Sequence, residues 1–425
     1  MRSIISMPHN PLPKLSKTLH ALLPGIFLLG FNIGTGSVTA MAKAGATYGM
    51  SLLWTIFLSC MVTYFMIVSY GRYTLVTGET ALYSFRKHIH PALGIFFIIA
   101  LTTAVSASVI GVMGIIVDIC SEWSKFYIPG GINPLYFAAF FIFLVYLLFW
   151  NGSTQGFQKA LAVIVAIMAG SFLINFFILS PPPIEILRGM LPHIPEVAEA
   201  TGRGPFLVIA SMVGTTVFSG LFIIRTTLVK EAGWTLKDLK IQRRDALISS
   251  LMMFVISATV MAAAAGTLYV NKMGLSRASQ MIELLEPLAG RLATAIFVSG
   301  IVAAGLSSQL PNVLMLPWLL CDYNGTPRNM KLARYRVMVL PISLLGFTVP
   351  LLKAPPVPVM IASQVFSALI LPITVFGILY LGNRKSLMGE HVNKTVSNVI
   401  LALILIFALY MSSIGVKGIW ETVFN

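Results

Sequence analysis

Residues 22–49 read LLPGIFLLGFNIGTGSVTAMAKAGATYG, an apolar stretch interrupted near its centre by Gly34–Ser37. Two glycines at that depth disfavour a continuous helix, so we expect the helix to break there. Residues 208–229, VIASMVGTTVFSGLFIIRTTLV, carry a comparable interruption at Phe218–Leu221. The glycines could instead serve close helix packing, since the first stretch also contains a GxxxG spacing. Matching breaks in two helices nevertheless favour a substrate site, because unwound backbone persists in a membrane where it lines a cavity.

The composition predicts an all-α polytopic membrane protein. Of the 425 residues, 57% are hydrophobic and 10% are charged, whereas a soluble domain carries about 25% charged residues. A membrane-spanning helix needs about 20 mostly apolar residues, and such stretches recur along the chain. We expect eleven of them, at 21–44, 50–71, 92–119, 134–150, 158–179, 204–228, 246–270, 288–316, 337–352, 357–381 and 396–415.

The order of these stretches predicts two repeats of five helices followed by one more helix. The two interrupted stretches open the two repeats, which is the pattern of an inverted-repeat transporter. We expect a tail at 1–20, a first repeat at 21–179, an external loop at 180–203, a second repeat at 204–381, and an inner loop with an eleventh helix at 382–425.

The formal net charge of +15 reflects membrane topology and not nucleic-acid binding. Lysines and arginines lie between the apolar stretches and form no single basic face. Most of the 29 fall in alternate loops, which predicts a cytoplasmic N-terminus and an external C-terminus. Three glycosylation sequons fall in predicted inner loops, where they cannot be glycosylated. A prokaryotic inner membrane suits this arrangement.

Several strings resemble, in the same order, the NRAMP family of proton-coupled divalent-metal transporters. The resemblance covers roughly residues 21–395. Its strings are Ala44-Gly-Ala, Tyr48-Gly to Trp54, Arg72 with Thr77-Gly78, Ile186-Leu-Arg-Gly-Met-Leu-Pro, Ala304-Gly-Leu-Ser-Ser, Ser363-Gln-Val, Leu371-Pro, and Arg384-Lys to Leu387-Met-Gly.

The resemblance implies a LeuT-type fold of five plus five inverted helices, with a site at the breaks of the first and sixth helices. It also implies Asp-Pro-Gly-Asn in the first break and Met-Pro-His-Asn in the second, but Gly34–Ser37 and Phe218–Leu221 stand there. The family's acidic residues of the third helix align with Val105 and Ser108. Of the expected site, only the glutamine of the tenth helix is retained, as Gln364.

The chemistry that remains is neutral and rich in backbone donors. No carboxylate or histidine lies at the centre of an apolar stretch, so we expect no metal site and no conventional proton relay. Half-helix N-termini favour a carboxylate, which predicts a small organic anion or zwitterion. The candidate substrate-binding residues are Gly34, Thr35, Gly36, Ser37, Phe218, Ser219, Gly220, Leu221 and Gln364.

Sodium is the candidate coupling ion, held by Ser307, Ser308 and carbonyls of the first break. Plain helix packing explains the same serines equally well. Arg225 lies two turns beyond the second break, where it could attract an anion, although we expect it to extend to the membrane surface.

Two other functions stay open. A divalent-cation transporter for Mn, Fe or Mg could use a diverged site of serine, threonine, glutamine and carbonyl oxygens. A sensor without transport activity could use the same scaffold. An enzyme is not expected, because no catalytic set of side chains lies at depth. We expect no cofactor and no partner besides the substrate and the bilayer, and a monomer suits the sequence.

Overall fold

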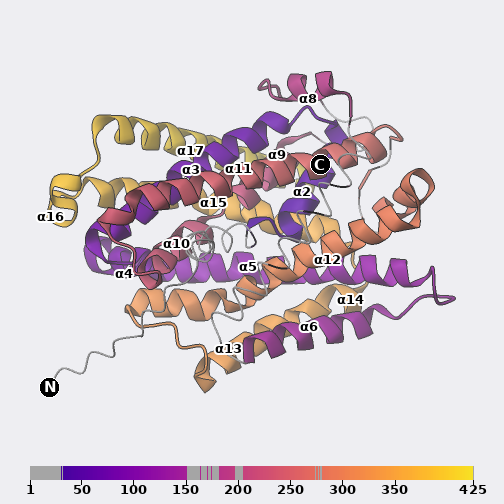
Figure 1. The fold of residues 1–425 in the computed structure, drawn as a ribbon, viewed down its shortest axis with the longest axis horizontal. Coiled ribbons are helices and arrows are strands. Elements are labelled where there is room, and N and C mark those ends of the chain that lie inside the picture. The colour runs from indigo at the N-terminus through magenta and orange to yellow at the C-terminus, as the bar shows by residue number, and fades with distance from the viewer. Residues whose placement is uncertain are drawn as a thin grey trace, which may run out of the picture.

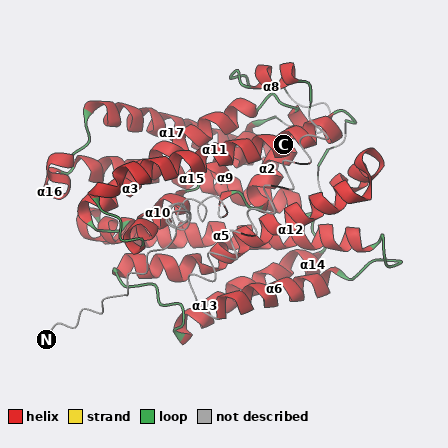
Figure 2. Cartoon of the chain, in the orientation of Figure 1, coloured by secondary structure: helices red, strands yellow, loops and turns green. Residues whose placement is uncertain are grey.

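The computed structural model describes residues 30, 32–150, 181–196, 204–272, 274–275, 277 and 280–424, with the single positions 163, 170 and 174. Within this part of the chain every regular element is a helix (Figure 2). The all-α prediction is therefore confirmed. The predicted tail at 1–20 and nearly all of the predicted fifth stretch at 158–179 lie outside the described residues.

The described helices follow the predicted apolar stretches, and several extend beyond them, such as α5, α12 and α17. The α-helices are α2 (Thr35–Tyr48), α3 (Leu53–Thr77), α4 (Ala81–Ser84), α5 (Pro91–Ser124), α6 (Pro134–Trp150), α8 (Pro183–Gly189), α9 (Phe206–Thr216), α10 (Ser219–Glu231), α11 (Leu239–Ala264), α12 (Gln280–Asn324), α13 (Ala333–Leu344), α14 (Thr348–Leu352), α15 (Pro356–Asn383), α16 (Lys385–Met388) and α17 (Thr395–Phe424). Shorter 3₁₀ or π segments are η1 (Phe85–Ile89), η2 (Leu236–Asp238), η3 (Ala265–Tyr269), η4 (Leu345–Phe347) and η5 (Gly389–His391).

Eight helical segments in the described chain are long and apolar enough to cross a membrane. One of them, Phe206–Glu231, consists of α9 and α10 and has 94% of its most apolar window buried. The long helices lie side by side and run between two ends of the bundle (Figure 1). The broken helices α2, α9 and α10 therefore lie inside it, where packed neighbours can satisfy freed backbone groups.

Local sequence signals set the ends of these helices. Gly78 ends α3 in the left-handed region, with φ of 68°, and its amide donates to the Thr74 carbonyl at 2.8 Å. Pro91 begins α5, where its missing N–H costs no helical bond, and His90 accepts a hydrogen bond from the Ala92 amide. The tight turn at Gly78 lets the chain reverse between two adjacent spans.

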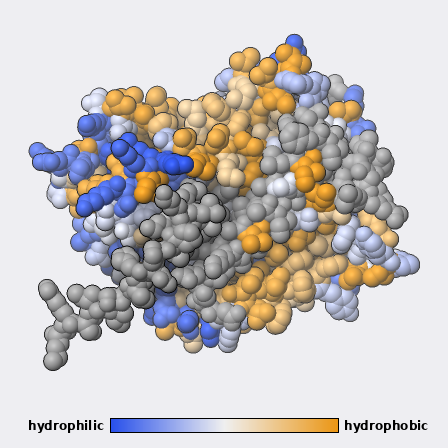
Figure 3. Space-filling view, in the orientation of Figure 1, coloured by the Kyte–Doolittle hydropathy of each residue, from blue (hydrophilic) through white to orange (hydrophobic). Residues whose placement is uncertain are grey.

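Charged side chains gather at one end of the bundle, which we call the basic end. The surface shows a broad hydrophobic band across the middle and a hydrophilic cluster at the left of the view, near α16 (Figure 3). The loops between α3 and α5, α10 and α11, α12 and α13, and α15 and α17 all lie at this end (Figure 1). These are the loops whose lysines and arginines predict a cytoplasmic face.

The short helix α4 is held at the basic end by side chains that are distant in sequence. Its first amide, of Ala81, donates to the Thr226 hydroxyl of α10 at 3.0 Å. The next two amides, of Leu82 and Tyr83, donate to the Asp322 carboxylate of α12. Helices α10 and α12 are therefore tied to the loop between α3 and α5.

Glu79 links several side chains of the loop between α3 and α5. Its carboxylate accepts hydrogen bonds from Lys87 at 2.8 Å, from Ser84 at 3.3 Å, and contacts the His88 ring at 2.7 Å. Burial alone would raise the pKa of Glu79, but the hydrogen bonds from Lys87 and His88 outweigh it and lower that pKa. The ionised carboxylate is therefore stabilised in the folded protein.

We expect Glu79→Gln to lower the melting temperature at pH 7 by about 1 to 2 °C, since such a partly exposed pair contributes about 1 kcal/mol or less. A lowered folded pKa contributes stability above the unfolded pKa of about 4.3, and this is lost as the pH falls through the folded value. Differential scanning fluorimetry from pH 7 to pH 3.5 should therefore show the two melting temperatures converge. A difference that grows towards low pH would contradict this assignment.

Candidate functional site

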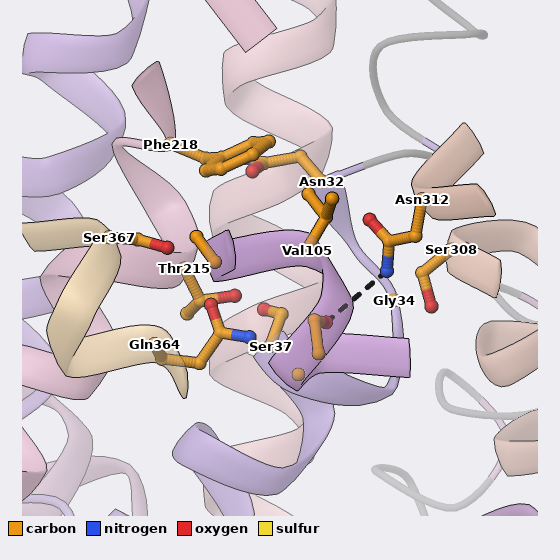
Figure 4. A pocket seen from close by; sticks show the side chains of 13 residues that line it. Asn32, Gly34, Ser37, Val105, Thr215, Phe218, Ser308, Asn312, Gln364 and Ser367 are labelled. Atoms are coloured by element: carbon orange, nitrogen blue, oxygen red, sulfur yellow. Dashed lines mark hydrogen bonds between the residues drawn. The ribbon is translucent and has the colours of Figure 1, made fainter. Parts of the chain in front are cut away.

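A cavity lies between the two helix breaks, and the space there that protein atoms do not fill, including the part open to solvent, is about 390 Å³. The side chains around it come from α2, α5, α9, α12 and α15 and from the breaks themselves (Figure 4). The lining residues are Asn32, Gly34, Gly36, Ser37, Ala104, Val105, Ser108, Thr215, Phe218, Ser308, Asn312, Gln364 and Ser367.

The first break lies at Ile33 and Gly34, slightly earlier than the predicted Gly34–Ser37. Helix α2 resumes at Thr35, so Thr35, Gly36 and Ser37 form its first turn. Gly34 has an extended backbone, with φ of −102°, and therefore needs no left-handed freedom. The glycine is required by close approach, because a Cβ there would lie 2.1 Å from the Ser308 Cβ.

The second break lies at Val217 and Phe218, again slightly earlier than predicted. Val217 ends α9 with φ of −105° and ψ of 51°, and Phe218 is extended before α10 begins at Ser219. Ser219, Gly220 and Leu221 are therefore helical. Glycine at position 220 leaves room for the Phe218 ring, since a Cβ there would lie 2.5 Å from that ring.

Both half-helices begin without a side-chain cap. Gly34 precedes α2 and Phe218 precedes α10, and neither first turn contains an acidic residue. The first intrahelical bond of α2 runs from the Val38 amide to the Gly34 carbonyl at 3.0 Å. The amides that come before it have no carbonyl within their own helix, so they can bind an acceptor.

Several oxygen atoms at the breaks lack a donor. The Thr35 hydroxyl and the Asn32 side-chain oxygen are buried and have no hydrogen-bond partner. Other polar groups are satisfied, because Asn312 donates to Ser108 at 3.2 Å and Ser308 donates to the Ala304 and Gly305 carbonyls of its own helix. Gln364 of α15 reaches towards the first turn of α2 (Figure 4).

The structure gathers some of the predicted site residues and excludes others. Those that line the cavity are Gly34, Gly36, Ser37, Phe218, Gln364 and Ser308, and those that do not are Thr35, Ser219, Gly220, Leu221 and Ser307. The Ser307 hydroxyl instead donates to the Ala304 carbonyl. The other four excluded residues lie in the first turns of α2 and α10, directly after the breaks, and are buried outside the cavity lining. For example, Ser219 accepts a hydrogen bond from Thr374 at 2.7 Å.

Sequence reasoning missed several lining residues. Val105 and Ser108 were identified only as positions where acidic residues are replaced, yet both line the cavity. The others are single small or polar residues on apolar helices, without a local motif. They are Asn32, Ala104, Thr215, Asn312 and Ser367.

None of the lining residues is titratable. Among the residues that the structure describes, no three His, Cys, Asp or Glu side chains come together as a metal site. The cavity therefore offers neutral amide and hydroxyl groups, uncapped helix N-termini, and an apolar wall that includes Phe218, Val105 and Ala104.

Arg225 does not extend to the membrane surface, so that expectation was wrong. Its side chain is fully buried, and its guanidinium donates to Asp245 of α11 at 2.6 Å. It also lies over the Trp234 ring, 5.3 Å from the ring centroid. Asp245 lies in the first turns of α11 and can reach Arg225 only in the folded bundle, so the sequence alone gave no sign of the pair.

The NRAMP family's sequence model, described as "Natural resistance-associated macrophage protein-like", matches residues 26–417. This match spans most of the chain. The chain belongs to the Nramp family. The resemblance inferred from short ordered strings is thereby confirmed, and the protein is a multi-pass membrane transporter by family.

Curated relatives of the chain are bacterial proteins named "Divalent metal cation transporter MntH". The one from Acidiphilium cryptum is 23% identical over 368 residues, covering 83% of this chain and 80% of that protein. The one from Erwinia tasmaniensis is 22% identical and covers 89% of each. For the Clostridium acetobutylicum protein, 24% identical over 259 residues, the aligned part spans 58% of each protein.

Solved structures support the fold. A crystal structure of a variant of the Eremococcus coleocola manganese transporter superposes with a TM-score of 0.77. The match covers 100% of this chain and 91% of that one, at 14% sequence identity. The LeuT-type fold with two broken helices is therefore confirmed. The predicted count of eleven membrane-spanning helices includes the stretch at 158–179, and nearly all of that stretch lies outside the described residues.

We expect Gly34→Ala to lower the free energy of unfolding of this Nramp protein by about 1 to 3 kcal/mol, because the added methyl group meets the Ser308 Cβ. The double variant Gly34→Ala with Ser308→Gly should recover much of the melting temperature, since it removes that carbon. The matched control, Gly34→Ala with Ser308→Ala, keeps the carbon and should not recover. Equal recovery by both double variants, measured by scanning fluorimetry, would rule out this contact as the cause.

Arg225→Met should cost about 3 to 5 kcal/mol, because Asp245 loses the guanidinium that offsets its buried charge. Arg225→Met combined with Asp245→Leu should restore most of the melting temperature, as expected when both charges of a buried pair are removed. Arg243→Met, an exposed arginine two residues before Asp245, is the control and should change little. A single Arg225→Met variant as stable as the wild type would disprove the assignment.

Proposed function

We propose that this Nramp protein is a secondary transporter of a small organic anion or zwitterion, such as an amino acid or a carboxylate. The supporting observation is the chemistry of the cavity lining, which combines neutral polar side chains with two uncapped helix N-termini. The matching broken helices support such a site, because transporters that alternate access from the two sides bind their substrates at helix breaks.

The cavity lining disfavours binding of a dehydrated divalent metal ion for a physical reason. A divalent cation that gives up its water needs hard oxygen ligands, with negative charge to offset the loss of hydration. The lining contains no carboxylate, and a cavity bounded by Gly34 and Phe218 offers neither a charged nor a soft sulfur ligand at the breaks. A dehydrated metal ion would therefore be poorly compensated here.

A carboxylate has favourable partners in the same place. The amides at the start of α2 and α10 have no side-chain cap, and the partial positive charge of a helix N-terminus favours an anion. The apolar wall formed by Phe218, Val105 and Ala104 can take a short hydrocarbon part of the solute. A small amphiphilic solute thus matches both surfaces.

Sodium is the proposed coupling ion. Ser308 approaches the first break closely, and its hydroxyl hydrogen is already directed to carbonyls of its own helix. Its oxygen lone pairs can therefore face a cation, together with carbonyls of the break. Ser307 contributes less in this arrangement, because it lies outside the cavity lining. We also propose that the basic end faces the cytoplasm of a bacterial inner membrane.

A divalent cation remains the second candidate, because the curated relatives carry that activity in their names. The unpartnered oxygens of Asn32 and Thr35 could serve a partly hydrated Mn, Fe or Mg ion. Such a site would need to bind through neutral oxygens alone, which predicts weak affinity.

Calorimetry on the purified protein should show binding of at least one small amino acid or carboxylate and no binding of manganese. Proteoliposomes should accumulate the same solute, faster with an inward sodium gradient than with a potassium gradient, whereas protein-free liposomes should not. Manganese binding with manganese uptake would overturn the proposal in favour of the second candidate. Organic binding without uptake of any solute would instead indicate a sensor.

A further inference from the structure

Asn32 joins the two helix breaks through a single carboxamide. The residue lies just before the first break, and its side chain is 6% exposed. Its side-chain nitrogen donates to the Thr216 carbonyl at 3.0 Å and to the Met253 sulfur at 3.1 Å. Thr216 is the last residue of α9, so this bond links the first break directly to the second.

The partners of the nitrogen fix the orientation of the carboxamide. A carbonyl oxygen and a thioether sulfur can only accept hydrogen bonds, so the atom facing them must be the nitrogen. The Thr216 carbonyl also accepts a bond from the Thr63 hydroxyl at 2.8 Å. The Asn32 oxygen is therefore directed elsewhere, and no protein donor reaches it although it is buried.

Asn32 lines the cavity, and its side-chain oxygen has the opposite hydrogen-bonding character to the helix N-termini. Asn32 lies beside Phe218 among the lining side chains (Figure 4). The amides at the starts of α2 and α10 are donors that need an acceptor, whereas the Asn32 oxygen is an acceptor that needs a donor. A single solute satisfies both when it carries an acceptor group such as a carboxylate and a donor group such as an ammonium.

We infer that Asn32 selects solutes with an amino group, so that the site takes a small zwitterionic amino acid in preference to the corresponding carboxylate. This inference rests on the proposed function. Charge supports the same choice, since the lining contains neither acidic nor basic side chains. A zwitterion enters such a site without net charge, whereas a simple carboxylate brings an unpaired negative charge into low dielectric.

Alanine and propionate provide the test, because they differ only in the amino group. Calorimetry on the wild-type protein should give an alanine affinity at least about tenfold higher than that for propionate, in line with a charge-assisted hydrogen bond. Asn32→Leu, of similar size but without the oxygen, should reduce the ratio of the two affinities to near one. It should do so mainly by weakening alanine binding.

Thr63→Val is the matched control. It removes the other hydrogen bond to the Thr216 carbonyl but leaves the Asn32 oxygen in place, so the affinity ratio should persist. If Asn32→Leu does not yield folded protein, Asn32→Ser, whose hydroxyl is shorter, should reduce the ratio in the same way. A wild-type ratio near one, or a ratio unchanged in the Asn32 variants, overturns the inference. Failure of both solutes to bind while manganese binds would instead refute the proposed function itself.

Discussion

The carbonyl of Thr216 is the constraint on which the centre of this protein depends. It ends α9 inside the bundle, where the break removes the helical hydrogen bond that this carbonyl would otherwise accept. Asn32 and Thr63 supply the two donors it needs, from the first break and from α3. Because a buried group left unsatisfied costs about 1 to 3 kcal/mol, the two broken helices must keep one relative position to keep these bonds.

Close packing around the breaks limits which side chains can stand there. Gly34 stands where the family's aspartate is expected, and its Cα approaches Ser308 so closely that no Cβ fits. Gly36 likewise packs on Gln364 and Met360, each within 2.5 Å of a Cβ built there. A carboxylate side chain at position 34 would therefore require a smaller residue at 308.

The sequence could predict the helices and their breaks, because these depend on length, composition and pairs of glycines. It could predict few of the cavity-lining residues, because these depend on tertiary contacts. Apolar runs located the helices, and the two interruptions located the breaks to within two residues. The helices resume at Thr35 and Ser219, the second residue of each predicted break, and Thr35, Ser219, Gly220 and Leu221 lie in helical turns outside the cavity lining. Asn32 and Asn312 gave no signal, since an isolated amide in an apolar helix has meaning only once its partners are known.

The buried ion pair on α10 lies away from the cavity. The buried charged pair, Arg225 and Asp245, lies beyond the second break and joins α10 to α11. Thr226, its neighbour in sequence, binds the first amide of α4 at the basic end. The half-helix that begins at the cavity is thus fixed at its far end by an ion pair and a hydrogen bond, while its near end presents only amides. Any movement of α10 that opens the cavity towards the basic end must therefore carry α4 and α11 with it or break buried polar contacts, which makes rigid-body motion of these helices the less costly route.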